Sequence, residues 1–412
     1  MSRGACAEVL VIGGGPVGWA FALATCEALG SGADVLLIDA LDPAAAVGEA
    51  EAPSVPMATR VVLLAEGNRR WLASCGVSFP PGRVCEVNRI EVATTAGAPD
   101  LIIEARDAGA ERLGVVLEHE QLRRALAVRA RQLGVQFRAG IARAVSPVHG
   151  EARWVELESG EVFEAKLVVL AEGRVARLAE PLGIERLVRE YGQLGLVAHF
   201  RLARREPGIA RQWFLPDGSI LALLPLADPG SLRADSGNDC VSMVYSCGGE
   251  TAQRLIALAP EALVEEIRCL AGGRIDLTEC LTAAEAFPLG LTRVADPVAE
   301  RLMLAGDAAH TVHPLAGQGV NLGLADARVW QALIRECERT GGDLGHRLLL
   351  SAYRRRRQAA VLMMQAVIDG LWRLYNRSPA WLSALSGPAM RSLSCSSAFR
   401  QCLARAAVQT AL

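Results

Sequence analysis

The stretch VLVIGGGPVG, Val9–Gly18, decides the fold. Its four leading apolar residues are typical of a buried strand, and a helical pattern follows the glycines. Gly13, Gly15 and Gly18 have the spacing G-x-G-x-x-G. In this spacing the three glycines permit a tight turn, a close approach of the backbone to a pyrophosphate, and close packing of helix on strand. The stretch therefore predicts a strand–turn–helix unit that binds a dinucleotide.

An acid stands at the place where such a unit needs one. The next apolar run, Val35–Ile38, ends at Asp39, 21 residues after Gly18. A carboxylate there accepts hydrogen bonds from ribose hydroxyls, while the N–H groups and positive dipole end of the new helix face the phosphates. The unit thus opens a doubly wound sheet. The alternative interpretation is a tight turn between strand and helix without a ligand.

The glycine motif alone does not distinguish FAD from NAD. The chain has no second G-x-G-x-x-G, because GQGVNLG, Gly317–Gly323, carries one residue too many. A single dinucleotide fold must hold the redox cofactor permanently. If NAD(P)H is the electron donor, it binds transiently and without a dinucleotide-binding domain of its own.

The rest of the chain divides into two further parts. From about Tyr191 to Ser246, short strand-like runs alternate with turn signals such as PDGS and DPGS, which indicates an antiparallel sheet. Beyond Gly345 the pattern is nearly all helical, with breaks expected at Pro379 and Pro388. The other expected elements are a helix at Arg60–Cys75, a strand at Val115–Leu117, a helix at Glu120–Leu133, strands at Val135–Arg138, Arg153–Glu158, Val162–Ala171 and Leu302–Ala305, and a long helix after Gly319.

Charge and composition narrow the function classes. The formal net charge of −2 gives no reason to expect nucleic-acid binding. From Leu344 onward, however, the sequence contains ten arginines and one acid, Asp369. The run Arg354–Arg357 is interpreted as a solvated helix face; the alternative is contact with anionic lipid, aided by Trp372 and Trp381. No apolar run is long enough to span a bilayer, so we expect a cytoplasmic protein that meets the inner face of a membrane only at its surface.

Cysteines and histidines give no metal or disulfide signal. The eleven cysteines include no CxxC pair, which is typical of free and mostly buried thiols in a reducing compartment. His310 and His313 are three residues apart, but no third ligand lies nearby. We therefore expect no metal site and a structural role for both histidines beside the cofactor.

The most informative stretch is LMLAGDAAHTVHPLAGQGVNLGLADA, Leu302–Ala327. A buried strand ends at Gly306–Asp307, where a carboxylate can accept hydrogen bonds from a polyol chain. The helix that opens near Gln318–Asn321 offers N–H groups and a positive dipole to an anion. A reduced flavin carries negative charge on its ring, which the positive end of this helix would stabilise.

This stretch resembles the signature of the ubiquinone-biosynthesis hydroxylases, within the group A flavoprotein monooxygenases related to para-hydroxybenzoate hydroxylase. Other features of that family recur as LVVLA before Gly173, FPL at Phe287–Leu289, and LSAYRRRR at Leu350–Arg357. The resemblance implies that Asp307 binds the ribityl chain of FAD, that Pro314 lies beside the flavin ring, and that Gly317–Asn321 hold its pyrimidine edge. The residues then expected at the cofactor are Gly13, Gly15, Gly18, Asp39, Arg60, His119, Gly306, Asp307, Gly317, Gln318, Gly319, Val320 and Asn321.

The resemblance also implies a fold class and a domain division. The expected fold is α/β, with a Rossmann-like FAD-binding domain, an antiparallel-sheet substrate domain and a helical carboxy-terminal region. The expected FAD-binding domain comprises residues 1–84, 114–182 and 285–340. The substrate domain comprises residues 85–113 and 183–284, and the helical region residues 341–412.

The implied activity is hydroxylation of an aromatic ring through a flavin hydroperoxide, with O2 and a reduced donor, NAD(P)H. The implied substrate is a polyprenylated phenol or quinol on the route to ubiquinone, lying between the flavin and the antiparallel sheet. A complex of ubiquinone-biosynthesis proteins is an implied partner. Two alternatives stay open: a monooxygenase of a soluble aromatic substrate, and a flavin-binding accessory protein with little turnover. The second is motivated by three departures from the family pattern, Glu172, Ala58 and His119, with Ala176 in place of a serine.

Overall fold

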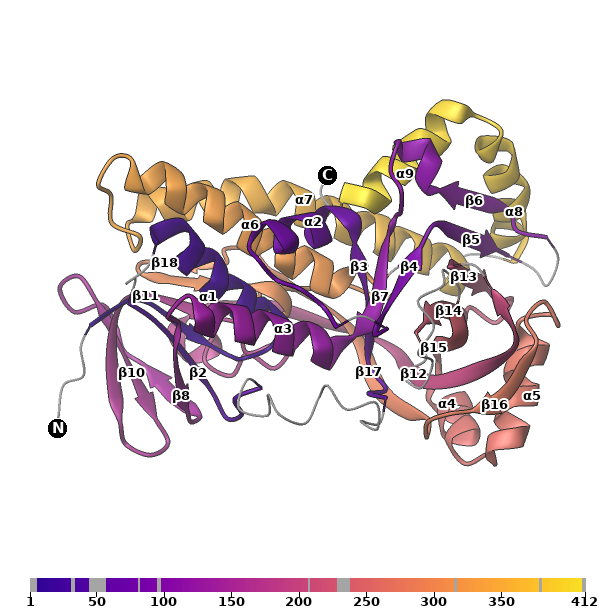
Figure 1. Ribbon diagram of the computed structural model, residues 1–412, viewed down its shortest axis with the longest axis horizontal. Coiled ribbons are helices and arrows are strands. Elements are labelled where there is room, and N and C mark those ends of the chain that lie inside the picture. Colours follow the sequence, from indigo (N-terminus) through magenta and orange to yellow (C-terminus); the bar gives the residue numbers. More distant parts are fainter. Residues whose placement is uncertain are drawn as a thin grey trace.

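The computed structural model describes residues 6–30, 34–43, 57–80, 82–94, 98–206, 208–227, 238–314, 317–377 and 380–409; for residues 238 and 380–385 it describes the backbone alone. Two large sheets lie at opposite ends of an elongated molecule, and a long helix runs along both (Figure 1). The mixed α/β class, with a doubly wound sheet, an antiparallel sheet and carboxy-terminal helices, is the one that the sequence predicts.

The first sheet contains the predicted dinucleotide unit. β1 (Ala7–Ile12) pairs in parallel with β2 (Val35–Asp39) on one side and with β11 (Val162–Leu170) on the other. These strands are almost continuously apolar because both faces of the sheet are covered. The order is β18-β19-β11-β1-β2-β8, with β10 and β9 beyond β11. The remaining bounds are β8 Gln136–Ala139, β9 Ala142–Val145, β10 Arg153–Leu157, β18 Val298–Ala299 and β19 Leu302–Leu304.

Three helices cover one face of this sheet. α1 (Pro16–Leu29) packs against α3 (His119–Gln132) and α6 (Gln318–Glu338), and the core between them contains Trp19 and Trp330. The helix predicted at Glu120–Leu133 and the long helix predicted after Gly319 are therefore both present, with bounds shifted by one or two residues.

The second sheet is built around one very long strand. β12 (Arg186–Glu206) pairs antiparallel with β15 (Asn238–Gly248) and with β17 (Glu285–Val294). The order is β20-β17-β12-β15-β14-β13-β5-β6, and among the strands that the structure describes here β13 and β5 alone pair in parallel. α4 (Gly249–Ile256) and α5 (Pro260–Leu270) pack on this lobe. The other bounds are β5 Arg89–Ala93, β6 Leu101–Glu104, β13 Ile209–Phe214, β14 Ile220–Leu226, β16 Leu277–Cys280 and β20 His310–Thr311.

The predicted division at residue 285 separates strands that the structure pairs. β17 begins at Glu285 and lies in the antiparallel sheet beside β12, although the predicted boundary gives it to the cofactor lobe. β5 and β6 lie in that same sheet, as their assignment to the substrate domain requires. The division at the stated boundaries stays a prediction.

A small third sheet corrects one predicted helix. β3 (Val61–Ala65) pairs antiparallel with β7 (Gly114–Glu118), which also pairs with β4 (Val84–Val87). The prediction of a single helix over Arg60–Cys75 was therefore wrong in its first half. The run VVLL is apolar at every position and mostly buried, which suits a strand, and α2 (Glu66–Ser74) begins only at Glu66.

The carboxy-terminal region is helical as predicted, but one predicted break was wrong. α7 (Arg347–Asn376) lies along α6, and α8 (Ala380–Ser394) and α9 (Ser397–Gln409) cover β5 and β6 (Figure 1). Pro388 lies inside α8. A proline costs the helix one backbone hydrogen bond, and an ion pair between Arg391 and buried Asp100 holds α8 on β6 across that point. Pro379 falls outside the described residues.

All eleven cysteines are free thiols, five of them buried. Within the described part of the chain, no helix combines the length and the apolar character needed to cross a bilayer.

Candidate functional site

The glycine turn between β1 and α1 shows why each glycine is present. An ideal Cβ on Gly18 would lie 1.8 Å from the carbonyl oxygen of Gly13. Gly13 has a φ of +110°, and its Cβ would lie 2.3 Å from the oxygen of Ala171. Gly15 differs, because no atom lies within 4 Å of the position of its Cβ. The protein itself therefore requires Gly13 and Gly18, while Gly15 leaves the start of α1 open to a ligand.

Asp39 ends β2 directly beside this turn. Its Oδ2 accepts the N–H of Gly14 at 2.5 Å, and its Oδ1 accepts the N–H of Leu41 at 3.1 Å. The carboxylate is thus fixed next to the helix start, where the sequence analysis expects it to meet a ribose.

A cavity of about 570 Å³ opens at the turn. It brings together four predicted site residues that are far apart in sequence: Gly15, Asp39, Arg60 and His119. Burial, and then the charge of Arg60, lower the pKa of His119 to about 4, so its imidazole is neutral at physiological pH. The other residues of the lining are Gly14, Met57, Ala58, Thr59, Glu120, Arg123 and Glu285.

The segment before Arg60 is held by its backbone, which the sequence analysis did not foresee. Glu118 accepts the N–H of Ala58 at 2.8 Å, and the carbonyl oxygen of Ala58 lies 2.9 Å from Nε2 of His199. Glu118 also forms a buried ion pair with Arg83 at 2.7 Å. Position 58 therefore acts through its main chain, which explains how alanine is tolerated where relatives of the resembled family have an acid.

The second cofactor segment lies against the first. β19 leads into a single 3-10 turn, Gly306–Ala308, and Gly306 has a φ of +59°. Ideal Cβ atoms on Gly306 and Gly323 would lie 3.0 and 2.4 Å from methyl carbons of Val17 in α1. Any larger residue at either position would push α1 away. Val17 thus joins the glycine turn to the Asp307 turn.

Asp307 is the chemically distinctive residue of this segment. Its side chain is half-buried, and no protein hydrogen bond to its carboxylate occurs among the described residues. Burial raises its pKa, against the opposing influence of His310, Arg60 and Arg174. A desolvated acceptor without a protein partner is costly unless a ligand supplies donors. The hydroxyl groups of a ribityl chain are such donors.

The start of α6 lies within reach of this acid. Gly317 caps the helix with a φ of +61°, and an ideal Cβ on Gly319 would lie 3.9 Å from Oδ1 of Asp307. Gln318 has a buried Oε1 that finds no hydrogen-bond partner among the described residues. Gly317, Gln318, Gly319 and Val320 are all half-buried. The free N–H groups of this helix end offer a place for negative charge.

Asn321 was predicted at the cofactor, but its side chain is occupied by contacts within the protein. Its side chain is fully buried, accepts the N–H of Ala65 at 2.9 Å and donates to the carbonyl oxygen of Leu63 at 2.6 Å. It therefore holds β3 to α6, and any contact that Asn321 makes with a cofactor must come from its backbone.

Pro314 lies on the segment between β20 and α6, directly after His313. His313 is fully buried; its Nε2 lies 3.3 Å from Oε1 of Gln193, and its ring contacts Tyr191 edge-on at 5.1 Å between centroids. Burial lowers the pKa of His313 to about 4. Within the described ranges, no cluster of three His, Cys, Asp or Glu side chains could hold a metal ion.

Two further residues of the site were missed. Asp326 in α6 and Arg357 in α7 form a fully enclosed ion pair at 2.6 Å behind the Asp307 turn. The interpretation of Arg354–Arg357 as one solvated face was therefore wrong at Arg357. A signal was available, because Asp326 is the single acid in the otherwise apolar run LGLADA, Leu322–Ala327, and a charge in a buried stretch requires a partner.

The geometry fits a flavin dinucleotide. One half supplies an open helix start beside the carboxylate of Asp39, and the other supplies a carboxylate without a hydrogen-bond partner in the described part of the chain, beside a second helix start. The two halves meet at Val17. Fold and site together define an FAD-binding flavoprotein.

Comparisons with known proteins agree. A family model described as an FAD binding domain matches residues 93–367, more than half of the chain. The ubiquinone hydroxylase UbiL of Rhodospirillum rubrum is 30% identical over 379 residues, which cover 91% of this chain and 83% of that protein. The 3-demethoxyubiquinol 3-hydroxylase of Escherichia coli is 30% identical over 368 residues, 88% of each chain. PqsL of Pseudomonas aeruginosa, solved in complex with 2-aminobenzoylacetate, has a similar fold, with a TM-score of 0.71 at 21% identity over 93% of this chain and 100% of that one.

The chain belongs to the ubiquinone-biosynthesis hydroxylases, a family of FAD-dependent monooxygenases.

Proposed function

We propose that the protein hydroxylates the aromatic ring of a polyprenylated phenol or quinol on the route to ubiquinone. The observation that carries the flavin chemistry is the unpartnered carboxylate of Asp307 beside the start of α6, joined through Val17 to the dinucleotide turn. The substrate class is supported by two relatives named for ubiquinone or ubiquinol hydroxylation, each aligned over more than four fifths of its length.

Bound FAD, once reduced by a donor such as NAD(P)H, supplies the activation of O2. The protein's part is to bind, orient and keep water out. Asp39 and Gly15 would hold the adenosine and pyrophosphate end, and Asp307 the ribityl chain. The N–H groups at Gln318–Val320 would stabilise negative charge on the reduced ring. No acid–base pair is needed for this chemistry, because an electron-rich phenol is itself the nucleophile.

An apolar aromatic cluster borders the segment that carries Pro314. Tyr191 of β12, Leu289 and Leu291 of β17, and Trp372 of α7 pack together, and His313 contacts the Tyr191 ring. The cluster therefore joins β12 and β17 of the antiparallel sheet to α7. We propose that the aromatic ring of the substrate is received on this side, next to Pro314, where apolar surroundings exclude water.

A lipid-facing surface is proposed on α7. Its exposed face carries Leu362, Met363 and Val367, which are 38%, 49% and 53% exposed. Exposed arginines flank these residues at Arg355 and at Arg373, which also pairs with Asp369 at 2.9 Å. An apolar strip between cations fits the surface of an anionic bilayer, each cation adding about 1 kcal/mol near such a surface. The proposed surface does not use the two tryptophans that the sequence suggested for lipid contact. Trp372 is buried and donates a hydrogen bond to Gln193, and the side chain of Trp381 lies outside the described residues.

Vesicle flotation tests this surface. The double variant M363E/V367E should lose most binding to anionic vesicles, and wild-type binding should weaken with salt. Leu348→Glu is the matched control, because Leu348 is 69% exposed on the first turn of the same helix, away from the strip. Equal flotation of wild type and M363E/V367E would contradict the membrane proposal without touching the hydroxylase proposal.

Quinone analysis in a strain that lacks the gene tests the function. The strain should accumulate a prenylated intermediate that is one oxygen atom short, and the wild-type gene should clear it. Asp307→Ala should fail to clear it although the variant protein accumulates. Normal ubiquinone in the deletion strain, in the absence of a second family member, would contradict the proposal and favour a soluble aromatic substrate.

The accessory-protein alternative predicts a different result in vitro. Bound flavin would then be reduced slowly by every donor and would not consume O2. The structure weakens its motivation at Glu172, which accepts the N–H of Leu178 at 3.2 Å and so closes its own turn. Rapid O2 consumption with a prenylated phenol would exclude this alternative.

A further inference from the structure

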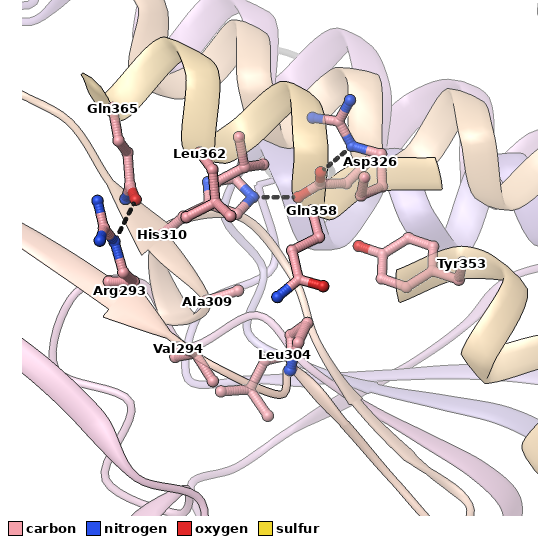
Figure 2. Close-up of a pocket in the computed structure, with 13 residues that line it drawn as sticks. Arg293, Val294, Leu304, Ala309, His310, Asp326, Tyr353, Gln358, Leu362 and Gln365 are labelled. Carbon is pink, nitrogen blue, oxygen red and sulfur yellow. Dashed lines mark hydrogen bonds and ion pairs between the residues drawn. The ribbon is translucent and has the colours of Figure 1, made fainter. Parts of the chain in front are cut away.

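The carboxylate of Asp326 is shared by three donors. Oδ2 accepts the backbone N–H of Gly306 at 3.1 Å and faces Nε2 of His310 at 2.7 Å, while Oδ1 accepts Nε of Arg357 at 2.6 Å. Figure 2 shows Asp326 between His310 and the guanidinium that reaches it from α7. The side chain of Asp326 is completely enclosed. Burial opposes its ionisation, but His310 and Arg357 lower its pKa to about 2.

Arg357 completes this hub and differs sharply from its neighbour in the arginine run. It is 5% exposed and also donates to the carbonyl oxygen of Leu322 at 3.2 Å. The adjacent Arg356 forms its ion pair with Glu336 at the surface, where both side chains are nearly half exposed. Surface pairs of this kind contribute little to stability, whereas breaking a buried pair leaves an uncompensated charge. Both pairs join α7 to α6, but only the pair of Arg357 with Asp326 is buried.

The position of the three donors points to a purpose. Gly306 immediately precedes Asp307, and His310 follows it by three residues. Asp326, which lies in α6, therefore holds both ends of the turn that carries Asp307. Asp307 itself has no protein hydrogen bond among the described residues. Its position is consequently set by the turn, and the turn is set by Asp326.

We propose that Asp326, with Arg357 as its charge partner, is the positioning residue for Asp307: it fixes the turn Gly306–His310 so that the Asp307 carboxylate is presented to the ribityl chain. This inference rests on the proposed role of Asp307 as a flavin ligand. It assigns to the carboxy-terminal helix α7 a part in cofactor binding through Arg357, although no residue of α7 is expected to touch the cofactor.

A double-mutant cycle on the FAD dissociation constant tests the proposal. In the wild-type background, Asp326→Asn should raise the Kd of the apoprotein for FAD by about ten-fold. In the Asp307→Ala background, the same change should raise it by less than about two-fold, because the residue through which Asp326 acts is already gone. Equal, additive effects in the two backgrounds would overturn the proposal.

Two controls separate positioning from general loss of stability. Asp343→Asn removes a carboxylate that pairs with Arg301 at 2.6 Å, remote from the Asp307 turn, and Arg356→Met removes the neighbouring surface cation. Both should keep the wild-type Kd and the wild-type visible circular dichroism of bound FAD. Asp326→Asn should alter that signal even at saturating FAD. An unchanged signal in Asp326→Asn, or the same change in Asp343→Asn, would contradict positioning.

A variant that keeps the buried ion pair covers the case in which Asp326→Asn does not fold. His310→Ala removes one donor beside Asp307 and leaves the pair of Asp326 with Arg357 intact. It should show the same non-additivity with Asp307→Ala. If Asp307→Ala leaves FAD affinity unchanged while either partner variant lowers it, the positioning role is refuted. The hydroxylase proposal is then still judged separately by the quinone composition of the deletion strain.

Discussion

The two halves of the flavin site are built in different ways. In the glycine turn, the constraints come from the turn and the strands beside it: Gly18 meets the oxygen of Gly13, Gly13 meets the oxygen of Ala171, and Asp39 accepts a hydrogen bond from Gly14. In the second half, Asp307 has a raised pKa and no protein partner, and its turn is held by side chains of two later helices. The first half is therefore fixed by local geometry, while the second depends on the packing of α6 and α7.

The largest effect is expected in the local half. Gly18→Ala places a methyl group 1.8 Å from a carbonyl oxygen, so we expect a loss of about 3 kcal/mol or more in the free energy of unfolding, or no folded protein. Gly15→Ala meets no atom within 4 Å and should change the stability of the apoprotein by less than about 1 kcal/mol, while FAD affinity falls. Thermal unfolding of the two apoproteins, followed by FAD titration, checks this. Equal destabilisation by both variants would contradict the distinction.

In the second half, removing the acid is expected to leave the stability of the apoprotein unchanged or to raise it, whereas Gly18→Ala lowers it. Because burial raises the pKa of Asp307, its ionised form is a cost to the apoprotein above the usual pKa of an aspartate. Asp307→Asn should therefore leave the melting temperature of the apoprotein unchanged or higher at pH 7, and weaken FAD binding by about ten-fold, or about 1.4 kcal/mol. Asp39→Asn serves as the comparison, since Asp39 already accepts two N–H groups and its loss should also destabilise the apoprotein. A lower melting temperature for Asp307→Asn would show that the acid has a structural partner.

The effect that is smallest at neutral pH concerns His313, because it appears only in acid. Burial lowers the pKa of His313 to about 4 from its ordinary 6.5. As the pH falls, His313 is therefore protonated in the unfolded chain before it is protonated in the folded chain. The resulting stability is fully present above pH 6.5 and is lost as the pH falls through 4, with an upper limit of about 3 kcal/mol. In His313→Gln, the slope of unfolding free energy against pH in this window should be shallower than in wild type. Chemical denaturation at several pH values between 4 and 7 measures it; parallel slopes would show that His313 is not buried in its neutral form.

The same contrast explains what could be predicted from the sequence. The glycine turn, Asp39 and the order of strands around them follow from spacing and apolar runs, which are local properties. The strand at Val61–Ala65 was predicted as a helix because a short apolar run has no period of its own, and only its pairing with β7 decides. The continuity of α8 through Pro388 likewise depends on tertiary contacts, here with β6.

In the second half, the sequence predicts which residues lie at the flavin but not which partners their side chains contact. The resemblance placed Asp307 and the start of α6 at the flavin, and the structure brings them together. Nothing in the sequence shows that the side chain of Asn321 is occupied by β3, or that Arg357 turns inward while Arg356 stays at the surface. These outcomes depend on how α6 and α7 face each other, which a one-dimensional pattern does not contain.

The most direct test of the two-part site is an FAD titration of the purified apoprotein. Wild type should bind one FAD per chain, without a covalent bond, and release it intact on denaturation. Gly15→Ala and Asp307→Asn should each weaken binding while remaining folded, because the first places a methyl group in the open space at the start of α1 and the second removes the negative charge of the acceptor. A wild-type protein that stays colourless and ignores added FAD, or a variant in either half that binds as tightly as wild type, would contradict the account.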